Sequence, residues 1–145
     1  MKTAGLGFLL LVFGLCSTPV PLTATVTVQA TQAAGLGMQA QLVVDVVNTG
    51  PAISHLGLVF RTGDRWFERH QMTELAGCSV ATDKSAFDCG DLAGGETRTF
   101  AFQGIANAAG TYHYELALRE LVQPFNYVND HPDGPDLQVW DETVS

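Results

Sequence analysis

The feature that most constrains the fold is a period of two in the apolar residues. In residues 39–47, Ala40, Leu42, Val44 and Val46 fall on one side of an extended chain, and the residues between them fall on the other. Successive side chains of a β-strand point to opposite faces of a sheet, so this spacing is typical of a half-buried strand. The same alternation recurs in residues 25–29, 53–61, 98–103, 111–119 and 137–143. The sequence therefore predicts six or seven strands.

Turn residues separate these strands. Asn48-Thr49-Gly50-Pro51 follows the strongest alternating segment, and residues 107–110 form a second turn signal. Residues 66–76 are the one helix candidate, although they fit a strand plus a loop equally well. Short strands joined by Gly/Pro turns predict a single all-β domain, an antiparallel β-sandwich with immunoglobulin-like topology. We expect this domain to cover residues 25–145 and to end in an acidic C-terminal extension.

The N-terminus has the pattern of a targeting segment. Lys2 precedes a run without polar side chains in residues 4–16, which is shorter than the roughly 20 apolar residues of a membrane-spanning helix. A short apolar run behind a basic residue is typical of a signal peptide. The pattern predicts a signal peptide in residues 1–24, cleaved after Ser17 or after Ala24, and an uncleaved anchor is the alternative. Either way we expect a secreted, periplasmic or cell-surface protein.

Cleavage at the later site removes one of the three cysteines and leaves Cys78 and Cys89. A pair of cysteines behind an export signal is typical of a disulfide, because the compartments outside the cytoplasm are oxidising. The sequence therefore predicts a Cys78–Cys89 disulfide around a polar loop.

Three segments together resemble a known kind of domain: VVDVVNTGPA (43–52), GCSVATDKSAFDCGDLAGGETRTFAF (77–102) and AGTYHYELAL (109–118). They are similar to an immunoglobulin-like repeat module of bacterial surface and secreted proteins, of the cell-adhesion-related type. The resemblance implies a spacer or adhesive unit without a shared active site. Such modules usually occur in tandem, whereas this chain has one, and the segment after Val122 departs from the pattern.

The charge balance limits the partners. The formal net charge is −8, which disfavours nucleic acid and anionic lipid, since both require clustered basic residues. One segment nevertheless combines three arginines with two aromatic residues, and such residues are enriched in protein interfaces. We therefore predict a partner-binding patch, with protein or a surface polymer as the partner, at Arg61, Arg65, Trp66, Phe67 and Arg69. The alternative is that one of the two aromatic side chains belongs to the core.

Signals for metal binding and catalysis are weak. His55 and His113 fit surface positions better than a metal pair. Asp130, Asp133 and Asp136 form an oxygen-rich loop that would suit calcium, but the same residues fit a plain turn, so we expect no metal site. The sequence contains no nucleophile elbow, and the cysteines are assigned to the disulfide. We expect no enzyme and no cofactor.

Two functions remain. The first is a non-catalytic exported binding or spacer module that acts in protein–protein or cell-surface interaction. The alternative is a structural subunit of an extracellular filament or envelope complex, assembled by strand complementation and therefore self-associating. In the alternative, residues 25–29 are the strand donated to a neighbouring chain, and the glycine-containing residues 34–37 are the hinge.

Export predicts a processed N-terminus. Because the apolar run is short and is followed by Pro19, Pro21 and small residues, we expect the mature chain to begin between Thr18 and Thr25. Intact-mass measurement of the exported protein checks this. A mass that retains Met1 or Lys2 would instead support the uncleaved anchor.

Overall fold

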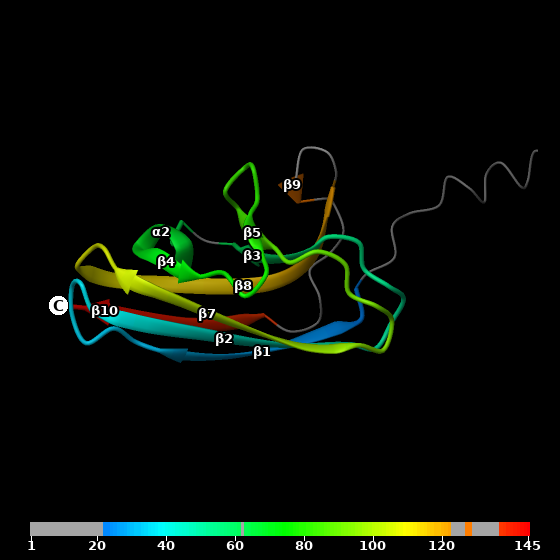
Figure 1. Ribbon diagram of the computed structural model, residues 1–145, viewed down its shortest axis with the longest axis horizontal. Helices are drawn as coiled ribbons and strands as arrows, with labels where there is room; N and C mark the ends of the chain where they lie inside the picture. The colour runs from blue at the N-terminus through cyan, green and yellow to red at the C-terminus, as the bar shows by residue number, and fades with distance from the viewer. Residues whose placement is uncertain (1–21, 62, 123–126, 129–136) are drawn as a thin grey trace, which may run out of the picture.

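The computed structural model describes residues 22–61, 63–122, 127–128 and 137–145. Two antiparallel β-sheets pack face to face, which confirms the predicted single all-β sandwich (Figure 1). The first sheet has the order β1 (Ala24–Thr31), β2 (Gln39–Asn48), β7 (Thr97–Ala106) and β4 (His70–Glu74). The second has the order β10 (Gln138–Val144), β8 (Gly110–Val122), β3 (Leu56–Phe60), β6 (Ala86–Asp88) and β5 (Ser79–Val80), and β9 (Tyr127–Val128) pairs with the end of β8.

The strand order is that of an immunoglobulin sandwich. When β9 and the β5–β6 hairpin are set aside, the first, second, fifth and fourth strands form one sheet, and the third, sixth and seventh form the other. Another immunoglobulin feature lies at the start of β8, where the Tyr112 hydroxyl donates a hydrogen bond to the Ala109 carbonyl oxygen at 2.9 Å. This contact has the form of the tyrosine corner, which fixes the turn that leads into the sixth strand.

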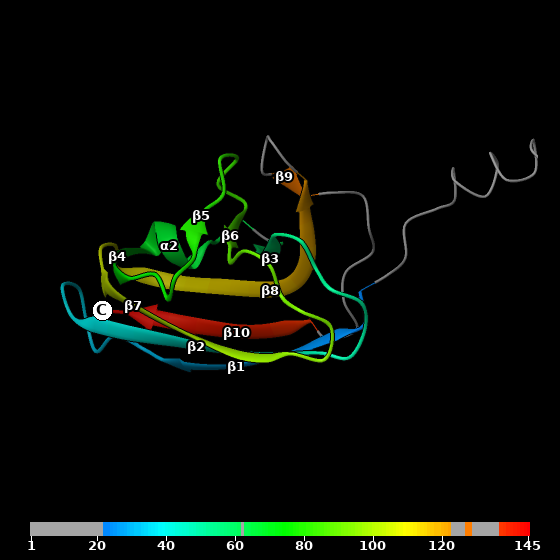
Figure 2. The same ribbon diagram turned by 45° about the vertical axis from the view of Figure 1, so that its right-hand side comes forward.

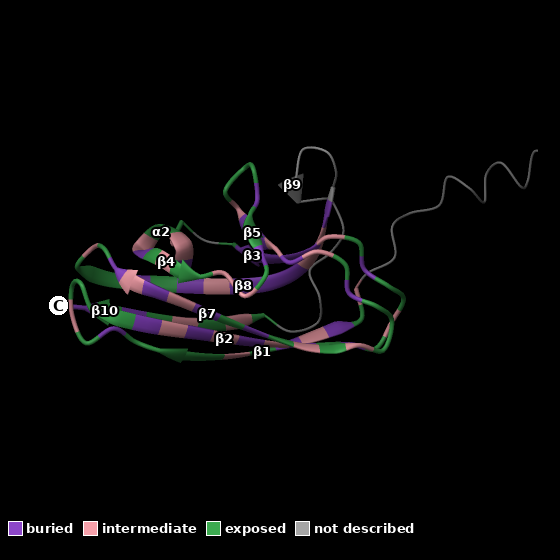
Figure 3. Cartoon of the chain, in the orientation of Figure 1, coloured by how far each residue is buried: buried purple, intermediate pink, exposed green. Residues whose placement is uncertain are grey.

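The core lies between the sheets, where the alternating residues meet (Figure 3). The inward residues of β2 are buried, and so are Tyr112, Tyr114, Leu116 and Leu118 of β8, as the period of two predicts. Phe60 lies at the centre of an aromatic cluster and makes edge contacts with Phe67, Phe87, Tyr114 and Trp140. Aromatic rings bury large apolar areas and favour edge-to-face contacts, so this cluster contributes much of the packing between the sheets.

The predicted turn at residues 48–51 is also a tertiary contact. The buried Asn48 side chain donates hydrogen bonds to the carbonyl oxygens of Pro51 at 2.8 Å and Ala93 at 3.1 Å. It also accepts one from the Gly50 amide at 3.0 Å. One asparagine side chain therefore joins the β2–β3 connection to the turn that precedes β7.

The helix candidate at residues 66–76 divides into two elements. A single helical turn, α2 (Trp66–Arg69), leads directly into β4, which pairs with β7. Gly104 in β7 allows this close packing, because a Cβ atom there would lie 2.8 Å from the His70 Cβ and 3.4 Å from the Trp66 ring. Residues 79–88, expected as a loop, form the β5–β6 hairpin. Pairing with a distant strand decides the conformation in both places, because β4 pairs with β7 and β6 pairs with β3.

The predicted Cys78–Cys89 disulfide is confirmed. Ser79 pairs with Asp88 in the hairpin register, so the two cysteines occupy the next opposed positions, with a Cα–Cα distance of 4.2 Å. Both cysteines are buried and belong to the main hydrophobic core. The disulfide therefore closes the base of the hairpin.

Replacing both cysteines, Cys78→Ser with Cys89→Ser, should lower the free energy of unfolding by about 2–3 kcal/mol, because the closed loop is short. Urea unfolding of the oxidised wild type and the double variant measures the difference. Equal stabilities, or two freely alkylated thiols in exported wild-type protein, would contradict this prediction.

Candidate functional site

The predicted partner-binding segment follows β3 and includes α2. Trp66 is only 1% exposed, and its ring stacks on the His70 ring with a centroid separation of 4.0 Å. Trp66 is therefore a core residue, as the alternative interpretation expected, and its inclusion in the partner-binding patch is wrong. Phe67 is half-buried, with its ring 5.0 Å from that of Phe87. The sequence could not separate these two neighbours, because the helical turn aims both toward the sandwich.

The arginines of this segment have acidic neighbours. Arg65 pairs with Glu68 at 2.9 Å, and Arg69 pairs with Asp64 at 3.0 Å. The Arg69 guanidinium also lies 4.7 Å from the centre of the Tyr112 ring. These ion pairs reduce the local positive charge that the sequence suggested. A partner-binding role for Arg61, Arg65, Phe67 and Arg69 stays a prediction.

A second cluster, which the sequence analysis missed, is buried between the sheets. Glu142 of β10 accepts a hydrogen bond from the Tyr114 hydroxyl at 3.0 Å. Its other carboxylate oxygen lies 3.1 Å from His70 Nε2, and His70 Nδ1 lies 2.8 Å from the Trp66 carbonyl oxygen. His70, Glu142 and Tyr114 are all 2% exposed or less. We call these three residues the buried network.

The buried network shifts the pKa values of its acids. Burial by itself would raise the pKa of Glu142, but the hydrogen bond and charge of His70, together with the Tyr114 hydroxyl and the Ala33 amide, hold it below the ordinary value. Burial and the nearby Glu142 carboxylate raise the pKa of Tyr114, so its hydroxyl stays a donor. The network joins β4 of one sheet to β8 and β10 of the other, which makes it a connection between the sheets.

Two other histidines, His113 and His55, form separate surface contacts. His113 Nδ1 lies 2.6 Å from an Asp141 carboxylate oxygen, and its Nε2 lies 3.2 Å from Glu115. Hydrogen bonds to these two carboxylates raise the pKa of His113. His55 lies 3.3 Å from Asp88, so the structure does not bring His55 and His113 together as a pair.

Within the described part of the chain, no group of three or more histidine, cysteine or acidic side chains is arranged to hold a metal ion. The weak calcium candidate, Asp130, Asp133 and Asp136, lies outside the described residues.

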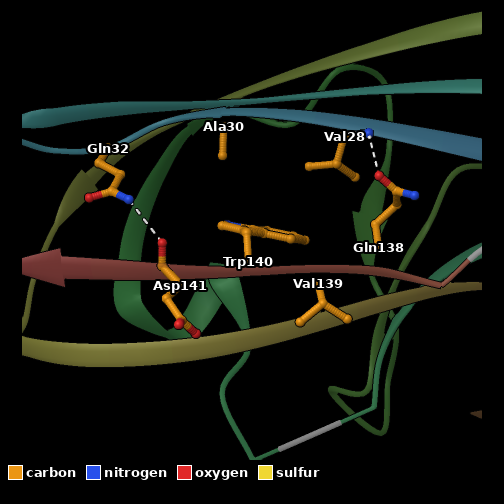
Figure 4. Close-up of a pocket in the computed structure, with 7 residues that line it drawn as sticks. All are labelled: Val28, Ala30, Gln32, Gln138, Val139, Trp140 and Asp141. Atoms are coloured by element: carbon orange, nitrogen blue, oxygen red, sulfur yellow. Dashed lines mark hydrogen bonds between the residues drawn. The ribbon is translucent and has the colours of Figure 1, made fainter.

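The candidate binding site is the open edge between β1 and β10. Each is the terminal strand of its sheet, and the two strands are in contact. Figure 2 shows β10 between β8 and the strands of the first sheet. Figure 4 shows a groove between them, with the Trp140 ring between the strands and Val139 on β10. Val139 is 53% exposed, whereas Trp140 is half-buried. We call this groove the β1–β10 edge.

Two glutamine side chains bridge the β1–β10 edge. The Val28 amide donates to Gln138 Oε1 at 3.3 Å, and Gln32 Nε2 donates to the Asp141 carbonyl oxygen at 2.9 Å (Figure 4). The Trp140 indole N–H is buried and has no hydrogen-bond partner among the described residues. Side chains thus take the place of strand-to-strand backbone bonds between β1 and β10. Only the tertiary structure brings residues 28–32 and 138–141 together.

No protein-family model matches this chain, and no curated protein is significantly similar to it. The described residues contain no helix that is both long enough and apolar enough to cross a membrane.

The buried network predicts a strong effect of removing the carboxylate. Glu142→Ala leaves His70 and Tyr114 buried without their partner, and should lower the free energy of unfolding by about 3–5 kcal/mol. Glu142→Gln keeps an acceptor and should lose less. Urea unfolding at pH 7 measures both variants. Equal losses would contradict a role for the retained acceptor, and a Glu142→Gln variant as stable as the wild type would contradict a role for the charge.

The stability contribution of Glu142 should also depend on pH. Its folded-state pKa is lowered, so its contribution is present above the ordinary value of 4.5 and is lost as the pH falls below it. The free energy of unfolding of the wild type should therefore fall as the pH is lowered below 4.5. Glu142→Gln has no carboxylate to protonate at this position, so its free energy of unfolding should fall less over the same pH range. The same acid dependence in both proteins would contradict the assignment to Glu142.

Proposed function

We propose that the protein is a non-catalytic exported module that acts in protein–protein or cell-surface interaction, either by binding a partner or as a spacer. The observation that carries the proposal is the β1–β10 edge, where two terminal strands offer backbone edges beside the exposed Val139. Protein segments in extended conformation bind such edges through backbone hydrogen bonds, and the neighbouring side chains supply specificity. The Cys78–Cys89 disulfide supports a role in an oxidising compartment outside the cytoplasm.

The course of the chain supports the spacing role. β1 starts at one end of the sandwich, and the last described residue lies at the opposite end, close to the β1–β2 connection (Figure 1). The Ser145 carbonyl oxygen accepts a hydrogen bond from the Leu36 amide at 2.9 Å, which fixes this end. A module of this shape holds groups attached to its two ends apart by the length of the sandwich. The resemblance of residues 43–118 to bacterial surface modules suggests the same role.

The binding role is tested at Val139. Val139→Lys should lower binding of the purified exported protein to washed cells of its source about tenfold, because a charge in the groove must be desolvated on binding. Val80→Lys on the β5–β6 hairpin is the matched control, since Val80 is exposed too. Cell-bound protein is measured by quantitative immunoblotting.

Equal binding of the two lysine variants would rule out the β1–β10 edge as the contact surface. If the wild type does not bind to the cells at all, the binding role itself is contradicted.

A second candidate is the subunit assembled by strand complementation. It is favoured because β1 pairs with β2 along one edge only, and the connection after β1 contains Gly37 with a left-handed φ of 81°. Exchange of β1 between copies would build a dimer or a chain of subunits. Size-exclusion chromatography at increasing protein concentration separates this candidate from a monomeric binding module.

A further inference from the structure

The outer face of the first sheet differs in charge from the rest of the molecule. Its side chains are the odd-numbered residues of 25–31, 39–47 and 97–105, since the even-numbered residues of those strands point toward the other sheet. Gln71 and Glu74 of β4 lie on the same face, because they pair with Ile105 and Gln103. These sixteen positions hold five threonines, five glutamines, four aliphatic residues and two acidic residues, Asp45 and Glu74. We call this surface the Thr/Gln face.

The Thr/Gln face has no basic residue and only two acidic ones. The sequence contains 15 acidic and 7 basic residues in total, and the surfaces of soluble domains are commonly designed with roughly a quarter to a third charged side chains. Both acidic groups are also engaged, since the Asp45 carboxylate accepts a hydrogen bond from the Thr99 hydroxyl and the Glu74 carboxylate accepts one from the Ala76 amide at 2.8 Å. The face therefore presents neutral hydrogen-bonding groups almost exclusively.

The face is also regular. β1 pairs with β2 over eight residue pairs, and β2 pairs with β7 over nine, without a register shift. Its polar groups consequently lie in rows across the strands, such as Thr27–Asp45–Thr99. At one end Gln39 Nε2 donates to Gln103 Oε1 at 2.9 Å, beside a shallow hollow that Thr31 and Gln41 also line.

These groups match one class of ligand better than others. Protein interfaces are enriched in aromatic residues, methionine and arginine, and this face has none of them. An anionic polymer requires basic side chains, which are also missing from these positions. Hydroxyl and amide groups both donate and accept hydrogen bonds, as the hydroxyls of a sugar require. The aliphatic residues at the centre, Val43 and Ala101 among them, suit the C–H faces of sugar rings.

We infer that the Thr/Gln face binds an uncharged polysaccharide. The inference goes beyond the proposed function, because it assigns a second surface, the sheet face rather than the β1–β10 edge, and names its ligand class. A strand of ten residues, as in β2, extends about 34 Å, so a linear chain of several sugar units can lie along it. Many neutral hydrogen bonds of modest strength, rather than one deep pocket, provide the affinity.

The test is native electrophoresis through gels that contain a neutral polysaccharide, with mixed-linkage β-glucan, galactomannan and xyloglucan as probes and alginate as the acidic probe. We expect at least one neutral probe to retard the exported wild-type protein and alginate to leave it unaffected. Ala101→Glu adds a charge to the centre of the exposed face and should weaken retardation at least tenfold. Gln103→Ala, which removes an amide without adding charge, should weaken it by a smaller factor.

The matched control is Thr143→Glu, because Thr143 is an exposed strand residue on the other sheet. It should be retarded like the wild type. Thermal melting of every variant checks that the fold is kept. If Ala101→Glu proves to be unfolded, the retardation of Gln103→Ala is the result that tests the inference. The inference would be overturned if no neutral polysaccharide retards the wild type, or if Thr143→Glu weakens retardation as much as Ala101→Glu does.

Those results are separable from failure of the proposed function. If no neutral polysaccharide binds but Val139→Lys still weakens binding to cells, the Thr/Gln face inference is overturned and the proposed function is retained. If neither surface binds anything, both are overturned.

Discussion

A carboxylate buried between two sheets is the constraint on which the rest of this sandwich depends. Glu142 is 2% exposed, and an unpaired charge in that position would cost several kcal/mol. Its partners come from β4, from β8 and from the connection after β1, so it is satisfied only when all these elements are in place. Apolar packing alone is compatible with many relative positions of the two sheets, whereas the hydrogen bonds of Glu142 form in only one of them. The stacking of Trp66 on His70 is part of the same arrangement.

The burial of Trp66 removes it from the surface that a partner could contact. The sequence suggested a basic aromatic patch, but the tryptophan supports the buried network, and Arg65 and Arg69 pair with acidic neighbours. Two other surfaces are left with groups available for a partner. One is the β1–β10 edge, with its glutamine bridges and exposed Val139, and the other is the Thr/Gln face. They differ in chemistry, because the first offers backbone groups and the second offers neutral side chains.

Both surfaces fit the proposed role as a binding module. The disulfide closes the hairpin, Asn48 joins two connections, and the tyrosine corner fixes the start of β8. These local connections hold the ends of the strands, so the faces and edges keep their shape. A rigid sandwich loses little conformational freedom when it binds, which favours recognition by a flat or extended surface.

The sequence by itself determined the fold class, most strands and the disulfide. Strand position follows from the alternation of residues such as Leu42 and Val44, which depends only on neighbours in the chain, and the predicted cleavage leaves one cysteine pair to join. Only the tertiary structure decided the conformation of residues 66–76 and the pairing of the β5–β6 hairpin. It also decided which residues meet in the buried network and in the two candidate surfaces. Trp66 and Phe67, or Val28 and Gln138, acquire their surroundings from strands distant in sequence. A periodic pattern says which face of a strand is buried, but it carries no information about which strand lies opposite.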